Sequence, residues 1–180
     1  MVWLLIGVII GSVILDQLTK WLAVIYLKGE ASFPLWEEVL HFTYAENTGM
    51  AFSLFSGEDQ RWIFMLFSSI AIVGILVYLI FWRPESRWMQ VSLAMIVGGG
   101  IGNMIDRVLL GYVVDFIDFT LIDFAIFNVA DSFVCVGAGI LIVCLLIDLK
   151  KEMAVEKAAK LASKASAEET ETPEEKEDEN

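Results

Sequence analysis

The amino-acid sequence predicts a mainly α-helical membrane protein: a four-transmembrane-helix bundle with a small extracytoplasmic β-containing segment between the first two helices. Hydrophobic residues make up 57% of the 180 residues and the mean hydropathy is +0.67, whereas an average soluble domain is about 45–50% apolar. Four runs are apolar enough to cross a bilayer, which takes about 20 residues. The formal charge of −12 is uneven, since residues 165–180 carry a net −7. These features exclude a soluble globular enzyme.

The first span is expected over residues 2–27. Val2–Leu15 is uncharged, Asp16 and Lys20 follow, and Trp21–Leu27 is apolar again. A cleaved signal peptide would carry a basic n-region and a small-residue cleavage site. No lysine or arginine precedes Asp16, and no A-x-A-like site follows the apolar run. We therefore expect a helix that is retained.

Three further spans follow along the chain. Trp62–Trp82 is an uncharged run of 21 residues, and Trp88–Ile105 is an uncharged run of 18. Phe124–Ile147 is apolar except for Asn128 and Asp131. Because the number of spans is even, both ends of the chain are expected on the same side of the membrane.

Basic residues set the expected orientation, because lysine and arginine accumulate in cytoplasmic loops. Arg83 and Arg87 lie between the second and third spans, and Lys150 and Lys151 follow the fourth. We therefore expect both termini in the cytoplasm. The segments left on the outer side are residues 28–60 and 107–123.

The first outer segment is expected to contain a short β-hairpin on the outer leaflet. Val39–Tyr44 mixes β-branched and aromatic residues, and Glu46–Gly49 is a turn-like cluster. His41, the single histidine, falls within this stretch. We expect it to be a surface strand residue without a catalytic role.

The chain is expected to divide into a transmembrane domain, residues 1–150, and a charged cytoplasmic tail, residues 151–180. Lys150–Ala167 is rich in alanine, lysine and glutamate and is expected to extend the fourth helix. Glu168–Asn180 is acidic and polar, a composition typical of disorder. No internal repeat is evident, so a transporter built from inverted halves gains no support.

Composition also limits the chemistry. One histidine and two cysteines cannot form a multi-histidine metal site or a zinc module. We expect neither a metal nor an organic cofactor, since a carboxylate pair can act as both acid and base. Cys135 and Cys144 are nine residues apart, and two residues so spaced point to opposite sides of a helix. We interpret them as small apolar residues. Twelve lysines and arginines spread along the chain form no basic face for a nucleic acid.

Polar residues gather at the outer ends of the predicted spans. Ionisable groups within spans cost about 2.5–3.5 kcal/mol each on insertion scales, so they usually have a role. Pairs spaced i,i+3 or i,i+4 share a helix face, and the G-x-x-x-G formed by Gly98 and Gly102 permits close helix packing. The residues expected at one depth near the outer surface are Asp16, Lys20, Asn103, Asp106, Arg107, Asp115, Asn128 and Asp131.

Asp115 and Asp131 differ from the other acids. Asp115 is flanked by apolar residues, and no cation lies within four positions of Asp131. Two such carboxylates at one depth can share a proton, which suits aspartic hydrolysis. A proton or cation pathway through the membrane explains them equally well. A structural adaptor that uses its acidic tail to recruit a basic partner is a further alternative.

Five segments stand out for their polar and glycine residues, in this order along the chain: Asp16–Lys20, Glu46–Ser53, Gly98–Arg107, Val113–Phe116 and Phe127–Ser132. In order and in register, they resemble the lipoprotein signal peptidases (signal peptidase II) of bacteria, and the similarity covers about residues 1–150. A G-x-G-D motif typical of presenilin-type proteases is absent, and His41 lies outside any G-x-S-x-G context.

The resemblance implies an aspartic endopeptidase that removes the signal peptides of prolipoproteins, cutting immediately before the diacylglyceryl-modified cysteine. It implies the bacterial cytoplasmic (inner) membrane as location, an active site near the outer leaflet, and membrane lipids as the other partner. We expect a monomer. The lipoproteins that are cut, and any movement of residues 28–60 as a lid, are not predicted by the sequence.

The same resemblance assigns roles to individual residues. Asp115 and Asp131 are the expected catalytic pair. Asp118 and Asp123 match no motif and are expected to be surface acids. The residues expected to bind substrate or support the site are Asp16, Lys20, Asn47, Gly49, Gly98, Gly102, Asn103, Arg107, Asn128 and Ala130.

Overall fold

A computed structural model describes residues 1–49, 59–122 and 124–170 of the chain. The chain divides into two compact units, Met1–Leu141 and Ile142–Asn180. Every residue of the candidate site belongs to the first unit. The tail boundary expected at residue 150 stays a prediction.

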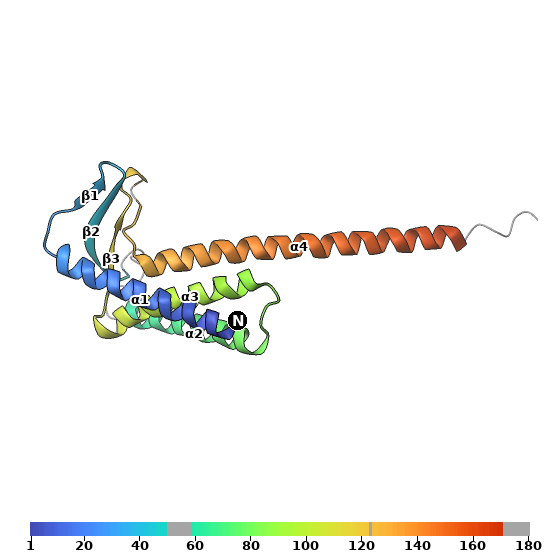
Figure 1. Cartoon of the computed structure of the whole chain (residues 1–180), viewed down its shortest axis with the longest axis horizontal. Coiled ribbons are helices and arrows are strands. Elements are labelled where there is room, and N and C mark those ends of the chain that lie inside the picture. The colour runs from blue at the N-terminus through green and yellow to red at the C-terminus, as the bar shows by residue number, and fades with distance from the viewer. Residues whose placement is uncertain (50–58, 123, 171–180) are drawn as a thin grey trace, which may run out of the picture. The chain divides into compact units, whose positions relative to one another are not determined.

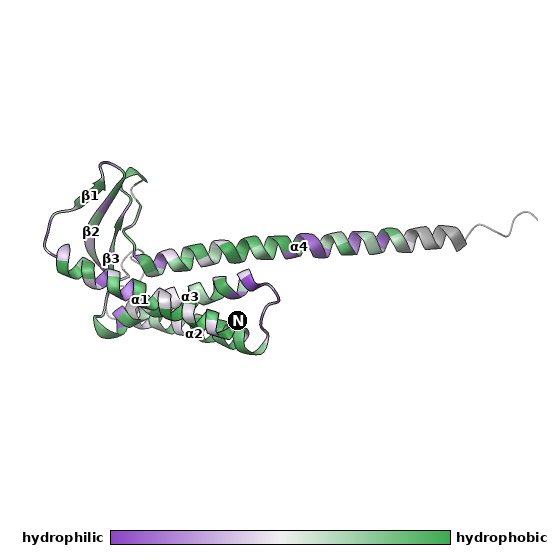
Figure 2. Ribbon diagram, in the orientation of Figure 1, coloured by the Kyte–Doolittle hydropathy of each residue, from purple (hydrophilic) through white to green (hydrophobic). Residues whose placement is uncertain are grey.

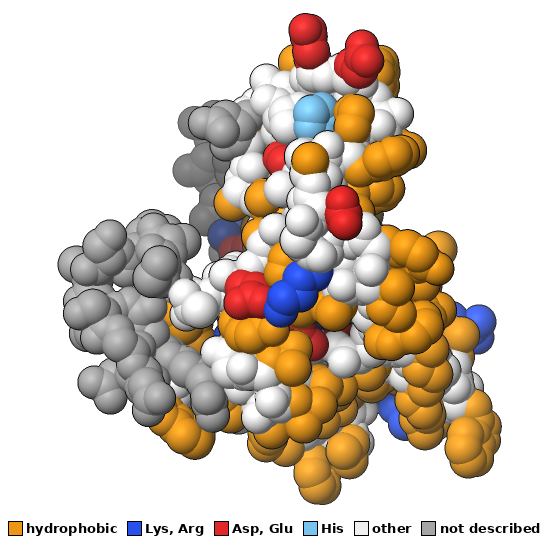
Figure 3. All heavy atoms as spheres, turned by 90° about the vertical axis from the view of Figure 1, so that its left-hand side faces the viewer, with side chains coloured by type: hydrophobic (Ala, Val, Ile, Leu, Met, Phe, Trp, Pro, Cys, Tyr) orange, Lys and Arg blue, Asp and Glu red, His pale blue; other side chains and the backbone are white. Residues whose placement is uncertain are grey.

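Among the described residues, four helices are long and apolar enough to cross a membrane, and Figure 2 shows their mainly hydrophobic composition. This confirms the predicted number of spans. Apolar side chains such as Trp3, Phe67 and Ile80 are exposed, and hydrophobic side chains cover much of the face seen in Figure 3. In a membrane, such side chains contact lipid. The helices are α1 (Val2–Tyr26), α2 (Asp59–Phe81), α3 (Arg87–Leu109) and α4 (Val129–Thr170).

Small residues on α3 allow its neighbours to approach closely. A Cβ atom added to Gly98 would lie 2.7 Å from the Cβ of Ser12 on α1. One added to Gly99 would collide with the carbonyl oxygen of Ala130 at the start of α4. Helix α3 therefore packs closely against α1 and against the start of α4, and the contact at Gly98 is the close approach that the G-x-x-x-G spacing predicts.

A three-stranded antiparallel sheet lies at one end of α1 and α3 (Figure 1). Strand β1 (Phe33–Trp36) and β2 (Leu40–Asn47) come from the first outer segment, and β3 (Val113–Asp118) comes from the second. The sheet therefore joins the two outer segments, and β3 is a strand that the sequence analysis did not predict.

The hairpin differs from its prediction. The chain turns between Trp36 and Leu40, and Glu46 and Asn47 belong to β2 instead of a turn. The reason is long-range pairing, because Glu46 lies opposite Val114 and Asn47 opposite Val113. Local turn propensity at these positions is overridden by the ladder with β3.

The fourth helix begins later than expected, at Val129 instead of Phe124. Phe127 forms an isolated antiparallel bridge with Ile117, which holds the preceding segment beside β3. Asn128 then caps the helix: its side-chain oxygen accepts the Asp131 N–H at 2.9 Å, and the Asp131 carboxylate accepts the Asn128 N–H at 3.2 Å. This reciprocal pair is a capping box.

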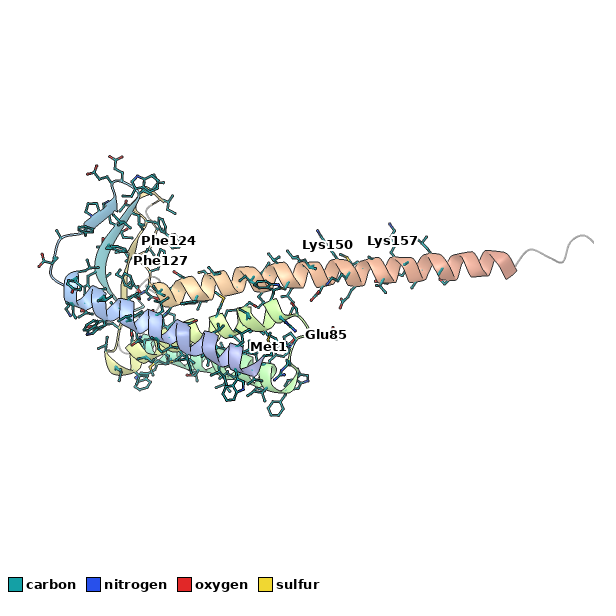
Figure 4. The ribbon with its side chains drawn as sticks, viewed as in Figure 1. Met1, Glu85, Phe124, Phe127, Lys150 and Lys157 are labelled. Atoms are coloured by element: carbon teal, nitrogen blue, oxygen red, sulfur yellow. The ribbon has the colours of Figure 1, made fainter. Side chains whose placement is uncertain are left out.

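The two ends of the first unit are distinct. Met1 lies at one end, together with Glu85, which is in the turn between α2 and α3 (Figure 4). Phe124 and Phe127 lie at the other end, beside the sheet (Figure 4). The turn between α2 and α3 and the N-terminus therefore share one end of the helices. The outer segments share the other.

In the second unit, α4 continues to Thr170 and so includes Lys150–Ala167. Lys150 and Lys157 project from it as exposed side chains (Figure 4). The stretch expected to be disordered began at Glu168. In the structure, Glu168–Thr170 instead form the last residues of α4. The rest of that stretch lies outside the described residues.

Candidate active site

The structure brings together the two carboxylates that the sequence singled out. Asp115 lies in the middle of β3, and Asp131 lies in the first turn of α4. Asn128 contacts both: its Nδ2 donates to Asp115 Oδ1 at 2.6 Å, and its backbone N–H donates to Asp131 Oδ2 at 3.2 Å. Asn128 is completely buried, so a single fixed residue sets the relative position of the pair.

Asn47, at the end of β2, holds the second oxygen of Asp115. Its Nδ2 donates to Asp115 Oδ2 at 2.9 Å, while its side-chain oxygen accepts the Gly49 N–H at 2.9 Å. The Gly49 bond fixes which end of the amide faces Asp115. Gly49 has a φ of +87° and no room for a Cβ, which would lie 2.7 Å from the Phe64 ring, so a glycine is needed here.

Asn103 performs the matching role for Asp131. Its Nδ2 donates to Asp131 Oδ1 at 2.7 Å. Its oxygen accepts from Lys20 Nζ at 2.8 Å and from Asn128 Nδ2 at 3.1 Å. Because Lys20 and Asn128 both donate to this oxygen, the amide nitrogen is directed at Asp131.

Behind these residues, Lys20 forms ion pairs with Asp16 at 2.9 Å and with Asp106 at 3.1 Å. All three side chains are at most 4% exposed. Gln17 Nε2 donates to Asp106 Oδ1 at 2.9 Å and to the Gly102 carbonyl at 3.1 Å. Buried charges require such pairing and hydrogen bonding.

Asp106 was expected among the polar residues near the outer surface, but neither it nor Gln17 was among the residues predicted to bind substrate or support the site. Both lie inside the segments that carry the family resemblance, which was the available signal for Gln17. Their buried contacts could not be predicted, because they link α1 to α3.

The remaining predicted residues shape the backbone around this network. A Cβ on Gly102 would lie 2.5 Å from Asp16 Oδ2, and the Ala130 N–H donates to Asp16 Oδ1 at 2.9 Å. Arg107 is half-buried, donates to the Asn103 carbonyl at 3.4 Å, and lies with its guanidinium 5.5 Å from the Phe64 ring centre. This hydrogen bond is longer than those made by the other predicted residues.

Burial raises the pKa of the Asp115 carboxyl to about 6, and the charge of Asp131 acts in the same direction. Hydrogen bonds from Asn47 and Asn128 lower this pKa and limit the rise. With a pKa of about 6, Asp115 can hold a proton close to neutral pH, and a protonated carboxyl beside a second carboxylate suits combined acid and base catalysis.

Other candidate groups lie elsewhere. Asp118, at the end of β3, accepts from Thr43 at 2.8 Å, and Asp123 lies outside the described residues. His41 is in β2, as expected, but it is half-buried, with Nδ1 3.3 Å from Ser32 Oγ. Within the described part of the chain, no group of three His, Cys, Asp or Glu side chains is arranged to hold a metal ion.

Comparison with known proteins assigns the family. The family model described as Signal peptidase (SPase) II matches residues 8–147. A lipoprotein signal peptidase of Brevibacillus brevis is 41% identical over 149 residues, covering 83% of this chain and 97% of that protein. Another, of Trichormus variabilis, is 48% identical over 136 residues, covering 73% of this chain and 80% of that protein.

Solved structures agree with this result. A bacterial membrane enzyme solved at 2.3 Å superposes with a TM-score of 0.76 and 33% identity, covering 84% of this chain and 92% of its own. A second, solved at 1.9 Å, gives 0.75 and 34%, covering 81% and 94%. With both carboxylates inside the matched range, the chain belongs to the lipoprotein signal peptidase (signal peptidase II) family of bacterial multi-pass membrane enzymes.

Proposed function

We propose that this protein is an aspartic endopeptidase that removes the signal peptides of bacterial prolipoproteins, cutting immediately before the diacylglyceryl-modified cysteine. The observation that carries the proposal is Asn128, which hydrogen-bonds to both Asp115 and Asp131. Relatives named lipoprotein signal peptidase, 41% identical over nearly their whole length, support the substrate class.

In the proposed reaction, Asp115 carries the shared proton and Asp131 is ionised. The raised pKa of Asp115, about 6, supports this assignment, as does the position of Asp131 in the first turn of α4, since a helix N-terminus stabilises negative charge. Asp131 takes a proton from water while the water oxygen attacks the scissile carbonyl carbon. Asp115 donates its proton to the carbonyl oxygen.

The tetrahedral intermediate then collapses. The C–N bond breaks, the proton on Asp131 passes to the leaving amine, and the hydroxyl formed at the carbonyl returns its proton to Asp115. Both carboxyls regain their starting states. The reaction therefore consumes only water and the scissile peptide bond. General acid–base steps of this kind contribute about 10²–10⁴-fold each to a rate.

Asn47 is our candidate for binding the extended substrate backbone. It is exposed, and its amide carries a second N–H beside the one given to Asp115. Asn128 is buried and gives its amide hydrogens to Asp115 and Asn103. Asn128 therefore organises the pair, and Asn47 faces the space that a peptide would occupy.

We place the active site near the outer leaflet of the cytoplasmic (inner) membrane, with both termini in the cytoplasm. Arg83 and Arg87 flank Glu85 in the sequence, and Glu85 lies at the end of the helices opposite to the sheet (Figure 4). Basic residues favour the cytoplasm. The signal helix enters from the lipid, with its acyl chains left in the bilayer. We expect residues 28–60 to close over it, although 50–58 lie outside the described residues, and we expect a monomer.

The decisive experiment is cleavage of a purified precursor with and without its diacylglyceryl group. Wild type, Asp115→Asn and Asp131→Asn would be compared in detergent. We expect wild type to cut only the lipidated form, and each variant to remain folded but inactive. Turnover by either folded variant would contradict the assignment, and flux across liposomes without any cleavage would favour a transporter.

A further inference from the structure

The two carboxylates that flank Lys20 each make one more important bond. Asp16 Oδ1 accepts the Ala130 N–H at 2.9 Å. Asp106 Oδ2 accepts the Val114 N–H at 3.0 Å. Ala130 directly precedes Asp131, and Val114 directly precedes Asp115. Each carboxylate therefore holds the backbone immediately before one member of the pair.

Lys20 connects these two contacts. Its ammonium lies 2.9 Å from Asp16 and 3.1 Å from Asp106, so the backbone before Asp115 and the backbone before Asp131 are tied to one buried cation. Lys20 also donates to Asn103, which donates to Asp131. A displacement of the cation would be transmitted to both catalytic elements.

We propose that Asp106 is a positioning residue for the cleavage reaction: it holds β3 by the Val114 N–H, and Lys20 joins it to Asp16, which holds α4 by the Ala130 N–H. This inference rests on the proposed function. Displacing a catalytic group by 1 Å can cost about 10²-fold in rate, so the rigidity of this link has a catalytic consequence beyond stability.

Asp106→Asn is the first test. It removes one of two negative charges and leaves Asp16 and Lys20 as a balanced pair. The single amide oxygen can serve either the Gln17 side or the Val114–Lys20 side, and in either orientation the negative charge that pairs with Lys20 is lost, so the link between β3 and Lys20 is weakened. We expect kcat to fall by about 10–100-fold, with KM within about threefold of wild type, because the residue contacts no substrate.

Asp118→Asn is the matched control. It removes another carboxylate from the same region, one that accepts from Thr43 and lies at the far end of β3. Its kcat should stay within about twofold of wild type.

A second variant removes the donor instead of the acceptor. Replacing residue 114 by its α-hydroxy acid analogue converts the Val114 amide to an ester, which deletes the N–H and leaves all three charges in place. We expect the same selective loss of kcat. This variant decides the question if Asp106→Asn does not fold.

Each result has a clear meaning. Wild-type kcat in folded Asp106→Asn or in the ester variant would overturn the positioning role, as would an effect confined to KM. Both results leave the proposed function intact, because wild type still cleaves. Failure of wild type to cleave would instead overturn the proposed function, and this inference with it.

Discussion

At the scale of single residues, amide side chains organise the two carboxylates. Asn128 uses its backbone N–H, its side-chain oxygen and both amide hydrogens within the site. Asn47 and Asn103 each have an oxygen that accepts from a fixed donor, which directs their nitrogens toward the pair. Each oxygen of the two carboxylates therefore receives a donor whose direction is set by the fold.

Replacing Asn47 by alanine should shift the pH dependence of cleavage. The Asn47 hydrogen bond lowers the pKa of Asp115, so its removal should raise that pKa above about 6. If Asp115 supplies the required proton, the decline of kcat toward high pH should move to higher pH. Rates measured from pH 5 to 9 with the lipidated precursor would check this.

Thr48→Ala is a suitable control for Asn47→Ala, because it changes the neighbouring residue in the same segment. Its pH profile should match wild type. An unshifted profile for Asn47→Ala, with lower activity at every pH, would mean that Asn47 binds substrate without tuning Asp115.

At the scale of elements, α3 determines how closely the helices pack. Gly98 and Gly102 face α1, and Gly99 faces the start of α4. Gly137 on α4 in turn lies against α3, where an added Cβ would be 2.8 Å from the Ser92 carbonyl oxygen. These close contacts place the outer ends of three helices near enough for Asp16, Asn103 and Asp131 to belong to one site.

Gly98→Ala should destabilise the protein. The new methyl would lie 2.7 Å from Ser12 Cβ and 3.1 Å from the Ile9 carbonyl oxygen, so α1 would have to move. Overpacking of this kind costs about 1–3 kcal/mol. Thermal unfolding in detergent should show a lower midpoint.

Gly11→Ala provides the comparison within α1, since a Cβ there meets nothing within 4 Å. Removing a mid-helix glycine stabilises a helix by about 0.5–1 kcal/mol. Its midpoint should be equal to or higher than that of wild type. Equal destabilisation by both alanines would mean that helix contacts at Gly98 are not the cause.

At the scale of the whole molecule, the acidic end of the chain and the candidate site belong to different compact units. All site residues fall within Met1–Leu141, whereas Glu168–Asn180 contributes a net −7 of the total net charge of −12. Deleting Glu168–Asn180 should therefore leave kcat and KM within about twofold of wild type. Loss of function in a folded, membrane-inserted deletion would favour the adaptor hypothesis.

The topology gives a second prediction at this scale. With both termini inside, a fluorescent protein fused after Asn180 should fluoresce in cells. Alkaline phosphatase fused after Glu38 should be active, since it would be exported. The opposite pattern would invert the orientation and place the carboxylate pair at the inner leaflet.

The sequence alone predicted the four spans because each is a local property: a run of about 20 apolar residues bounded by charges. The proposal that Asp115 and Asp131 are the catalytic pair came from short motifs and the family resemblance. Strand β3 was not predicted, and the start of α4 and the hairpin turn were predicted at the wrong positions. Each depends on pairing between distant segments, such as Asn47 with Val113 and Ile117 with Phe127.

Hydrophobic composition thus determined that this chain crosses the membrane, how many times, and which polar residues share one end. Only the tertiary structure decided how those residues are bonded. Asp16 accepts a hydrogen bond from the backbone N–H of Ala130, 114 positions away in the sequence. Asp106 accepts one from the N–H of Val114, the residue before Asp115. Contacts of this kind arise from helix packing and strand register, because a linear pattern specifies faces and depths but not which buried donor meets which acceptor.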